Sequence, residues 1–432
     1  MQVNKNSDTI IWSKEIKFKN TRIQHYNNII VQTKGDNRQT LDPYSGQPKY
    51  DLNDDIYFVD PDLNIGVGYK SYSADSRSNT LEGINLLNGN KLWQREINRE
   101  YGWNDFFYIA DDTVIIVSGG IHSVNIKNGG GWYYNAVTGQ DDYSGTIATN
   151  VAGVALGLLT GTFIISTGYN VISDLASNVL MDGNYIFFAS KEEIVKIDKT
   201  NAGMLWQSKF ESFAGQSILW MDSSNIYMVN KGMALKNSRQ IPYKKPFYAA
   251  FNKQTGQIIY QVTFEEKDNP ILGLRISNDY AYLLLKNSIL KYNVTTGINE
   301  IKQIPAQQYG NLDFFIGNHV FIKYGEDSIK PIFATDTSKI FVFTKNGIAL
   351  SIDKDLNICD TISNKKLTVS CVDGAPMSFF ANQDKISVIN NDGIKCAELH
   401  AKLNDNAYII KNSLFYIEDK KLCIVNLEDL YK

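Results

Sequence analysis

A short pattern recurs along this chain and constrains its fold more than any other feature. It consists of an apolar residue, Asp or Asn, two variable residues, a small polar residue, Gly, and an aromatic residue four positions later. Good copies are I-N-L-L-N-G-N-K-L-W at 84–93 and F-N-K-Q-T-G-Q-I-I-Y at 251–260. The Asp or Asn side chain caps a tight turn by accepting hydrogen bonds from backbone N–H groups, and Gly supplies a positive φ. Each copy therefore predicts a hairpin between the third and fourth strands of a small antiparallel sheet.

The copies are spaced like the blades of a β-propeller. We call the Asp or Asn of each copy the anchor, and the anchors are Asp42, Asn85, Asn135, Asp198, Asn252, Asn293, Asp353, Asn390 and Asn426. Repeats of about 40 to 50 residues with four strands each are typical of propellers. The last three copies depart from the pattern, so we expect eight blades within a range of seven to nine. The sequence thus predicts one all-β propeller domain over residues 1–432.

The aromatic residue of each copy is expected to pack against the neighbouring blade. These blade-docking residues are Trp12, Tyr50, Trp93, Tyr143, Trp206 and Tyr260, and Ile301 takes the aromatic position in the sixth copy. Trp12 lies in T-I-I-W-S-K-E-I at 9–16, which resembles a lone outer strand. The C-terminal segment supplies inner strands without an outer one. We therefore expect the N-terminal strand to complete the last blade, which removes an open sheet edge.

The turn followed by an aromatic resembles the tryptophan-docking repeat of the PQQ-like, or quinoprotein-type, β-propellers, whose consensus is roughly A-x-D-x-x-T-G-x-x-x-W. The resemblance covers most of the chain. It implies two functions. One is a PQQ-dependent dehydrogenase with a quinone, a calcium ion and often two adjacent cysteines. The other is an assembly or scaffold protein, the role typical of members without cofactor residues. No residue here matches the cofactor ligands, and no Cys-Cys pair occurs.

No motif in the sequence indicates catalysis, a cofactor or a metal site. The four histidines, His25, His122, His319 and His400, share no ligand spacing. D-P-D-L-N-I-G at 60–66 begins like a calcium loop but lacks its glycine and its final Glu, so a polar turn is favoured. A nucleophile elbow, a P-loop and H-E-x-x-H are missing. We predict a protein that is not an enzyme. A PQQ dehydrogenase, or a hydrolase or lyase built from blade loops, is the alternative.

The net charge and the cysteines of the chain indicate which partners it binds and in which cellular compartment it lies. The net charge is −3 and no basic patch occurs, so nucleic-acid binding is not expected. The first residues contain no apolar core of a signal peptide, and the four cysteines form no C-x-x-C pair. These features predict a reduced protein in the cytoplasm. A periplasmic or extracellular location is the alternative if a signal peptide has been removed.

Residues 144–180 are predicted to form an apolar insertion between blades. G-V-A-L-G-L-L-T-G-T-F-I-I at 153–165 places glycine at every fourth position from Gly153 to Gly161. The apolar run continues without strand alternation, which favours helix for part of it. One membrane crossing would separate blades of the same ring, and two need about 40 residues. The uncharged run is shorter than that, so no transmembrane span is predicted.

Three interpretations of the insertion remain open. It packs on the propeller, it binds a protein partner, or it contacts a membrane surface through residues 146–173, the least favoured because the segment lacks a basic face. The partner-binding residues would be Gly153, Leu156, Gly157, Gly161, Phe163, Trp132 and Tyr133.

The function predicted from the sequence is a non-catalytic propeller scaffold that binds a protein partner. One specific form is a cytoplasmic immunity protein that neutralises a bacterial toxin.

Overall fold

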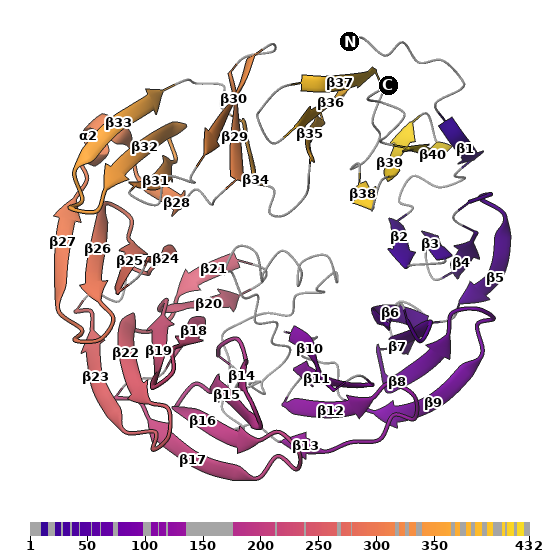
Figure 1. Ribbon diagram of the computed structural model, residues 1–432, viewed down its shortest axis with the longest axis horizontal. Coiled ribbons are helices and arrows are strands. Elements are labelled where there is room, and N and C mark those ends of the chain that lie inside the picture. The colour runs from indigo at the N-terminus through magenta and orange to yellow at the C-terminus, as the bar shows by residue number, and fades with distance from the viewer. Residues whose placement is uncertain are drawn as a thin grey trace.

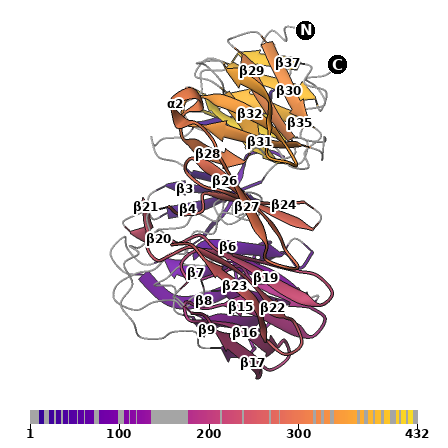
Figure 2. The same ribbon diagram turned by 90° about the vertical axis from the view of Figure 1, so that its left-hand side faces the viewer.

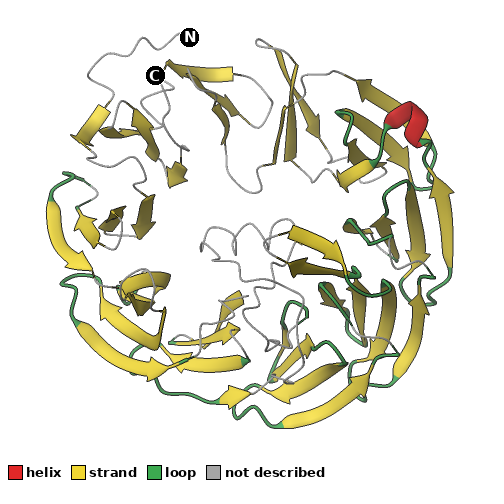
Figure 3. Cartoon of the chain, turned by 180° about the vertical axis from the view of Figure 1, so that it is seen from behind, coloured by secondary structure: helices red, strands yellow, loops and turns green. Residues whose placement is uncertain are grey.

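The protein is described by a computed structural model in which nearly all of the described secondary-structure elements are strands (Figure 3). The described residues are 10–15, 22–26, 29–34, 37–42, 44–52, 54–60, 62–71, 77–97, 105–110, 112–117, 120–134, 176–211, 214–236, 239–265, 269–277, 279–315, 319–324, 328–333, 339–363, 368–371, 377–381, 385–390, 395–400, 408–410, 413–418 and 421–426. Within this part of the chain the one helix is α2 (Ala306–Tyr309), a single turn.

The chain folds as an all-β propeller, with small antiparallel sheets arranged around a common centre (Figure 1). We number these sheets as blades 1 to 9 in chain order. Seen from the side in Figure 2, the strands of blades 2 to 5 lie in the lower half of the ring and those of blade 7 in the upper half. The first three blades are β2 (Arg22–Tyr26), β3 (Ile29–Lys34), β4 (Asn37–Leu41) and β5 (Pro48–Leu52); β6 (Asp54–Asp60), β7 (Ile65–Ser71), β8 (Arg77–Asn85) and β9 (Lys91–Glu96); and β10 (Asp105–Ala110), β11 (Thr113–Val117), β12 (Ile121–Asn125) and β13 (Tyr133–Tyr134).

In blades 4 to 6, as in the first three, the strands follow one another in chain order from the centre of the ring to its rim (Figure 1). They contain β14 (Leu180–Asp182), β15 (Tyr185–Ala189), β16 (Glu193–Asp198) and β17 (Met204–Lys209); β18 (Ser217–Met221), β19 (Asn225–Asn230), β22 (Phe247–Asn252) and β23 (Ile258–Thr263); and β24 (Gly273–Ser277), β25 (Tyr280–Leu284), β26 (Ser288–Asn293) and β27 (Asn299–Gln303). The hairpin of β20 (Met233–Lys236) and β21 (Arg239–Pro242) is inserted between β19 and β22.

The last three blades are less regular. They contain β28 (Leu312–Phe315), β31 (Lys339–Thr344), β32 (Ile348–Asp353) and β33 (Ile358–Ser363); β35 (Met377–Ala381), β36 (Lys385–Asn390) and β37 (Lys395–His400); and β38 (Tyr408–Ile410), β39 (Ser413–Glu418), β40 (Lys421–Asn426) and β1 (Ile10–Glu15). A hairpin of β29 (His319–Tyr324) and β30 (Ser328–Phe333) interrupts blade 7 and pairs with β34 (Thr368–Cys371). In the described residues, eight of the nine blades therefore have four strands. The exception is blade 8, which has three.

The N-terminal strand completes the last blade, as the sequence predicted. β1 pairs antiparallel with β40, and Trp12 lies opposite Ile424. The two ends of the chain thus share one sheet, which gives β40 a hydrogen-bonded neighbour on each side.

Each predicted anchor for which side-chain bonds are described caps a hairpin turn. The Oδ1 atom of Asn252 accepts hydrogen bonds from the backbone N–H groups of Gln254 and Thr255. Gly256 then adopts φ of +74°, which glycine tolerates better than other residues. In blade 4 Ala202 takes the same place with φ of +59°, because the copy there is shifted by one residue.

The third repeat was assigned wrongly. The β12–β13 turn begins at Asn125, whose Oδ1 accepts the N–H groups of Lys127 and Asn128. The aromatic of this repeat is Trp132, three residues after Gly129, so the four-residue spacing missed it. Asn135 and Tyr143, the predicted anchor and docking residue, lie outside the described residues.

The predicted insertion lies almost wholly outside the described residues, so its expected helix is not tested. It connects β13 of blade 3 to β14 of blade 4. Its predicted end at 180 is wrong, because Ala176 and Ser177 belong to the core of the propeller. Both are buried, and the N–H of Ser217 donates to the carbonyl of Ala176. Among the helices that the structure describes, none is long and apolar enough to span a membrane.

One contact joins consecutive blades along half of the ring. The aromatic ring of an outer strand lies over the turn glycine of the next blade. A Cβ built on Gly46, Gly89, Gly129, Gly256 or Gly297 would come within 3 Å of the ring of Trp12, Tyr50, Trp93, Trp206 or Tyr260, respectively.

Most of these rings, and also that of Trp132, donate a hydrogen bond to the carbonyl of the residue that follows the next anchor. The Nε1 atoms of Trp93, Trp132 and Trp206 donate to the carbonyls of Ile126, Lys199 and Lys253 over 2.6, 2.9 and 3.3 Å. The Tyr50 and Tyr260 hydroxyls donate to the carbonyls of Leu86 and Val294. A shared geometry of ring, turn residue and carbonyl therefore links blades 1 to 6, with Ala202 in place of the glycine in the turn of blade 4.

Replacing Trp93 by Phe should lower the free energy of unfolding by about 1–2 kcal/mol, because the buried carbonyl of Ile126 loses its donor. The matched variant Trp206→Phe should lose less, since its hydrogen bond is longer and its ring is half-buried. Chemical denaturation of the two variants measures this difference. Equal losses would contradict the role given to the indole N–H.

Replacing Gly256 by Ala should destabilise the protein by at least about 1 kcal/mol, because its φ is positive and the new Cβ would meet the Trp206 ring at 2.6 Å. Ala202→Gly at the matching turn position of blade 4 relieves the same backbone strain, so it should not lower stability. Thermal and denaturant unfolding would test the pair. A loss in Ala202→Gly as large as in Gly256→Ala would refute this account of the turn.

Candidate binding pocket between blades 5 and 6

Outer strand β27 departs from the docking geometry of the other blades. Most outer strands contain a β-bulge near the turn, as between Ala250 and Phe251 of blade 5, but the β26–β27 pairing has none. A one-residue change of register turns every following side chain to the opposite face. Ile301 is therefore directed back toward blade 5 with its partner Leu290, which packs among blade 5 residues.

Ile301 consequently does not take the docking role that its place in the repeat suggested. It is 52% exposed, whereas its neighbour Glu300 occupies the face toward blade 7 and forms an ion pair with Lys291 at 2.9 Å. Lys291 also lies above the ring of Tyr280, at 4.7 Å. The regular pairing of β27 thus replaces an aromatic contact with a half-solvated ion pair.

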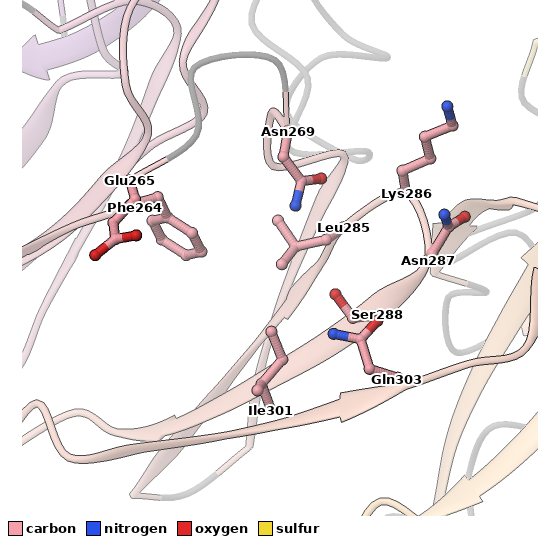
Figure 4. Close-up of a pocket in the computed structure, with 9 residues that line it drawn as sticks. All are labelled: Phe264, Glu265, Asn269, Leu285, Lys286, Asn287, Ser288, Ile301 and Gln303. Carbon is pink, nitrogen blue, oxygen red and sulfur yellow. The ribbon is translucent and has the colours of Figure 1, made fainter.

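A pocket of about 590 Å³ lies where Ile301 faces blade 5 (Figure 4). Its volume is within the range of small-ligand sites. Phe264, Glu265 and Asn269, between β23 and β24, supply one wall, and the β25–β26 turn and the end of β27 supply the other. The lining residues are Phe264, Glu265, Asn269, Leu285, Lys286, Asn287, Ser288, Ile301 and Gln303.

Backbone hydrogen bonds hold both walls in place. The N–H of Phe264 donates to the carbonyl of Pro246 over 2.9 Å, and that of Ile304 donates to Asn287 over 2.8 Å. Beyond the pocket, the N–H of Leu312 donates to the carbonyl of Lys286, which ties the turn to blade 7. The pocket therefore forms part of a connected framework.

The pocket combines an apolar wall with hydrogen-bonding groups. In Figure 4 the side chains of Phe264, Leu285 and Ile301 line one part of the space, and the amide of Asn269 points into it. Ser288 is buried beside Gln303, and the Oδ1 atom of Asn287 is buried without a hydrogen-bond partner among the described residues. Such a lining suits an apolar group that carries polar groups next to it, as in a peptide.

A cluster of tyrosines adjoins the pocket, where the ring of Tyr248 packs edge-on against that of Phe264 at 6.2 Å. The rings of Tyr248 and Tyr292 stack at 4.0 Å between blades 5 and 6, and Tyr260 packs at their edge. Burial raises the pKa of all three phenols, so they stay neutral at physiological pH. Asn299, at the start of β27, donates its amide to the Tyr248 hydroxyl over 2.7 Å.

Exposed apolar side chains gather on the outer strands of blades 4 to 6, which are neighbours on the rim of the ring (Figure 1). We call this set the apolar rim, and it consists of Met204, Leu205, Ile258, Ile259, Ile298 and Ile301. Ile298, in the turn before β27, is the most exposed at 73%.

The residues predicted to bind a partner are only partly described. Trp132 docks on blade 4, as given above, while Tyr133 is exposed and stacks on His122 at 4.5 Å. Gly153, Leu156, Gly157, Gly161 and Phe163 lie outside the described residues. The pocket residues were missed because they form no motif. The available signal was the replacement of the aromatic by Ile301 in the sixth repeat.

In the loop at residues 60–66 the Asp60 carboxylate accepts hydrogen bonds from the N–H of Leu63 and the hydroxyl of Tyr108, over 2.7 and 2.8 Å. The Asp60 carboxylate therefore stabilises a polar turn of the chain. No group of three or more His, Cys, Asp or Glu suited to a metal is found among the described residues.

Comparison with known proteins finds no matching family model and no matching curated protein. Solved structures with a similar fold include BamB from Moraxella catarrhalis (11% identity, 89% of this chain and 97% of that chain, TM-score 0.39). Others are a eukaryotic initiation factor (10%, 89% and 88%, 0.44) and the Cps50 (Swd1) β-propeller domain of Myceliophteria thermophila (7%, 77% and 97%, 0.32). At these values the similarity concerns the fold alone.

The loop that carries Phe264 and Asn269 is fixed at its far end by Lys231. The carbonyl of Lys231 accepts the N–H of Ile271 over 3.0 Å, and burial lowers the pKa of the Lys231 ammonium to about 8. The folded state therefore binds this proton less tightly than the unfolded chain, whose lysine has a pKa near 10.5. Stability should rise with pH between about 8 and 10.5 through this group.

Replacing Lys231 by Met removes this contribution. At pH 7 the variant should gain stability relative to the wild type, because it avoids the cost of burying a charged lysine. This gain in free energy of unfolding should be roughly 3 kcal/mol smaller at pH 10.5. Denaturant unfolding across this range is the measurement. Lys286→Met is the control, because Lys286 lies at the matching position in blade 6 and is exposed. It removes a lysine from a turn without removing a buried charge. Parallel pH curves for wild type and Lys231→Met would contradict the predicted shift.

Proposed function

We propose that the protein is a non-catalytic scaffold that binds a protein partner through the apolar rim of blades 4 to 6. The observation that carries the proposal is the set of exposed Met, Leu and Ile side chains on three consecutive outer strands, five on the strands themselves and Ile298 in the turn before β27. None of these side chains has a titratable or nucleophilic group. They can contribute to recognition by burial but not to acid–base chemistry.

The location of these residues separates the apolar rim from ordinary surface exposure. Single exposed apolar residues are common, as for Ile11 on β1 and Leu92 on β9. On β17 and β23, by contrast, two consecutive residues are exposed: Met204 with Leu205, and Ile258 with Ile259. Several exposed apolar side chains on neighbouring strands are costly in water unless something covers them, which supports a partner.

The three blades also hold the apolar rim in a defined shape. Trp206 of blade 4 lies over Gly256 of blade 5, and Tyr260 of blade 5 lies over Gly297 of blade 6. A surface that is ordered before binding loses less conformational entropy when the partner binds. An immunity protein that neutralises a toxin would be one specific form of this function, distinguished by the identity of the partner.

Site-specific photo-crosslinking in the cells that make the protein would test the proposal. A photoreactive residue in place of Leu205 or Ile259 should give a light-dependent adduct with one defined protein. The same residue at Gln94, an exposed polar position on outer strand β9, should give at least fivefold less. A Leu205→Glu/Ile259→Glu variant should lose the partner in co-purification. Equal labelling from all three positions, or none from the rim, would refute the proposal.

A further inference from the structure

Among the outer strands whose side chains are all described, β27 is the one with no buried or half-buried side chain. Its five side chains are all exposed, whereas β5, β9, β17 and β23 each have at least one buried or half-buried side chain. Among described outer strands that pair over three or more residues, β27 is also the one without a bulge. Bulges and packing are two ways in which proteins keep an edge from pairing with another chain.

The hydrogen bonds at both ends of the β26–β27 hairpin show which groups of β27 face outward. The N–H of Asn293 donates to Ile298, and the N–H of Ile304 donates to Asn287. In an antiparallel pair, residues alternate between bonding the partner strand and pointing away from it. The regular register therefore directs Glu300 and Lys302 to β26, and it directs the N–H and C=O groups of Asn299, Ile301 and Gln303 to the open edge.

The open edge adjoins the pocket. Ile301 and Gln303, whose backbone groups face outward, also line the pocket with their side chains (Figure 4). A strand added beside β27 would direct alternate side chains to the same face, next to those of Ile301 and Gln303. The residue beside Ile301 would meet the apolar wall of Phe264 and Leu285, and the polar groups of Ser288, Asn269 and Gln303 would surround it.

We propose that β27 binds an extended segment of a protein partner as a fifth strand of blade 6, with one apolar side chain of that segment in the pocket. The proposal rests on the proposed function, because it names how the partner is bound at one end of the apolar rim. Main-chain hydrogen bonds would supply affinity and the pocket would supply specificity, as in other cases of strand addition. The segment would have a large apolar residue with polar residues two positions to either side.

Peptides selected from a display library of random octapeptides on the full chain would test the proposal. Ile301→Pro removes one outward N–H without removing a β26–β27 hydrogen bond, so it should weaken the selected peptides at least tenfold. Lys302→Ala alters a side chain on the opposite face and should change their affinity less than twofold. If the proline variant does not fold, Ile301→Lys, which puts a charge beside the apolar wall, should weaken binding by a similar factor.

Hydrogen exchange gives a second readout that binding in the pocket alone would not change. Peptide binding should slow exchange of the amides of Asn299, Ile301 and Gln303, measured by mass spectrometry on a fragment covering 298–304. Failure to select any peptide, equal binding to Ile301→Pro, or unchanged exchange would overturn strand addition. Crosslinks from positions 205 and 259 would still report partner binding in each case, so the two proposals can fail separately.

Discussion

The contact between an outer-strand aromatic ring and the turn of the next blade is the interaction on which the regular part of this propeller depends. The ring meets a turn residue that is glycine in most of these blades and Ala202 in blade 4, and it donates to the carbonyl of the residue after the anchor. Both belong to the same hairpin that the anchor caps. One short turn therefore ends one blade and receives the previous one, which explains why the repeat retains its anchor, its glycine and its aromatic together.

Where the aromatic lies four residues after the turn glycine, the bulge beside the turn decides which blade it meets. With the bulge, Tyr260 faces forward to Gly297; without it, Ile301 faces backward to blade 5. The loss of one contact in blade 6 thus has three consequences at one place. β27 has no buried side chain, a pocket lies beside it, and its open edge adjoins the apolar rim. The departure from the repeat and the candidate site have the same structural cause.

Much of the fold could be predicted from the sequence because the repeat is a local signal. The hairpins at Asp42, Asn252 and Asn293, and the pairing of the N-terminal strand with the C-terminal one, lie where the pattern indicated. The prediction failed where the local spacing changed. In the third repeat a glycine run places Trp132 one position closer to its turn, so the pattern indicated Asn135 in place of Asn125.

The sequence by itself determined most of the blade hairpins and docking aromatics and the closing strand, because each belongs to one repeated unit with a local pattern. Only the tertiary structure decided the direction of Ile301, the pocket and the apolar rim. A bulge is a property of pairing between two strands, and the pocket combines residues of blades 5 and 6 that lie up to 39 positions apart, from Phe264 to Gln303. No local pattern records such a juxtaposition, since packing between blades creates it.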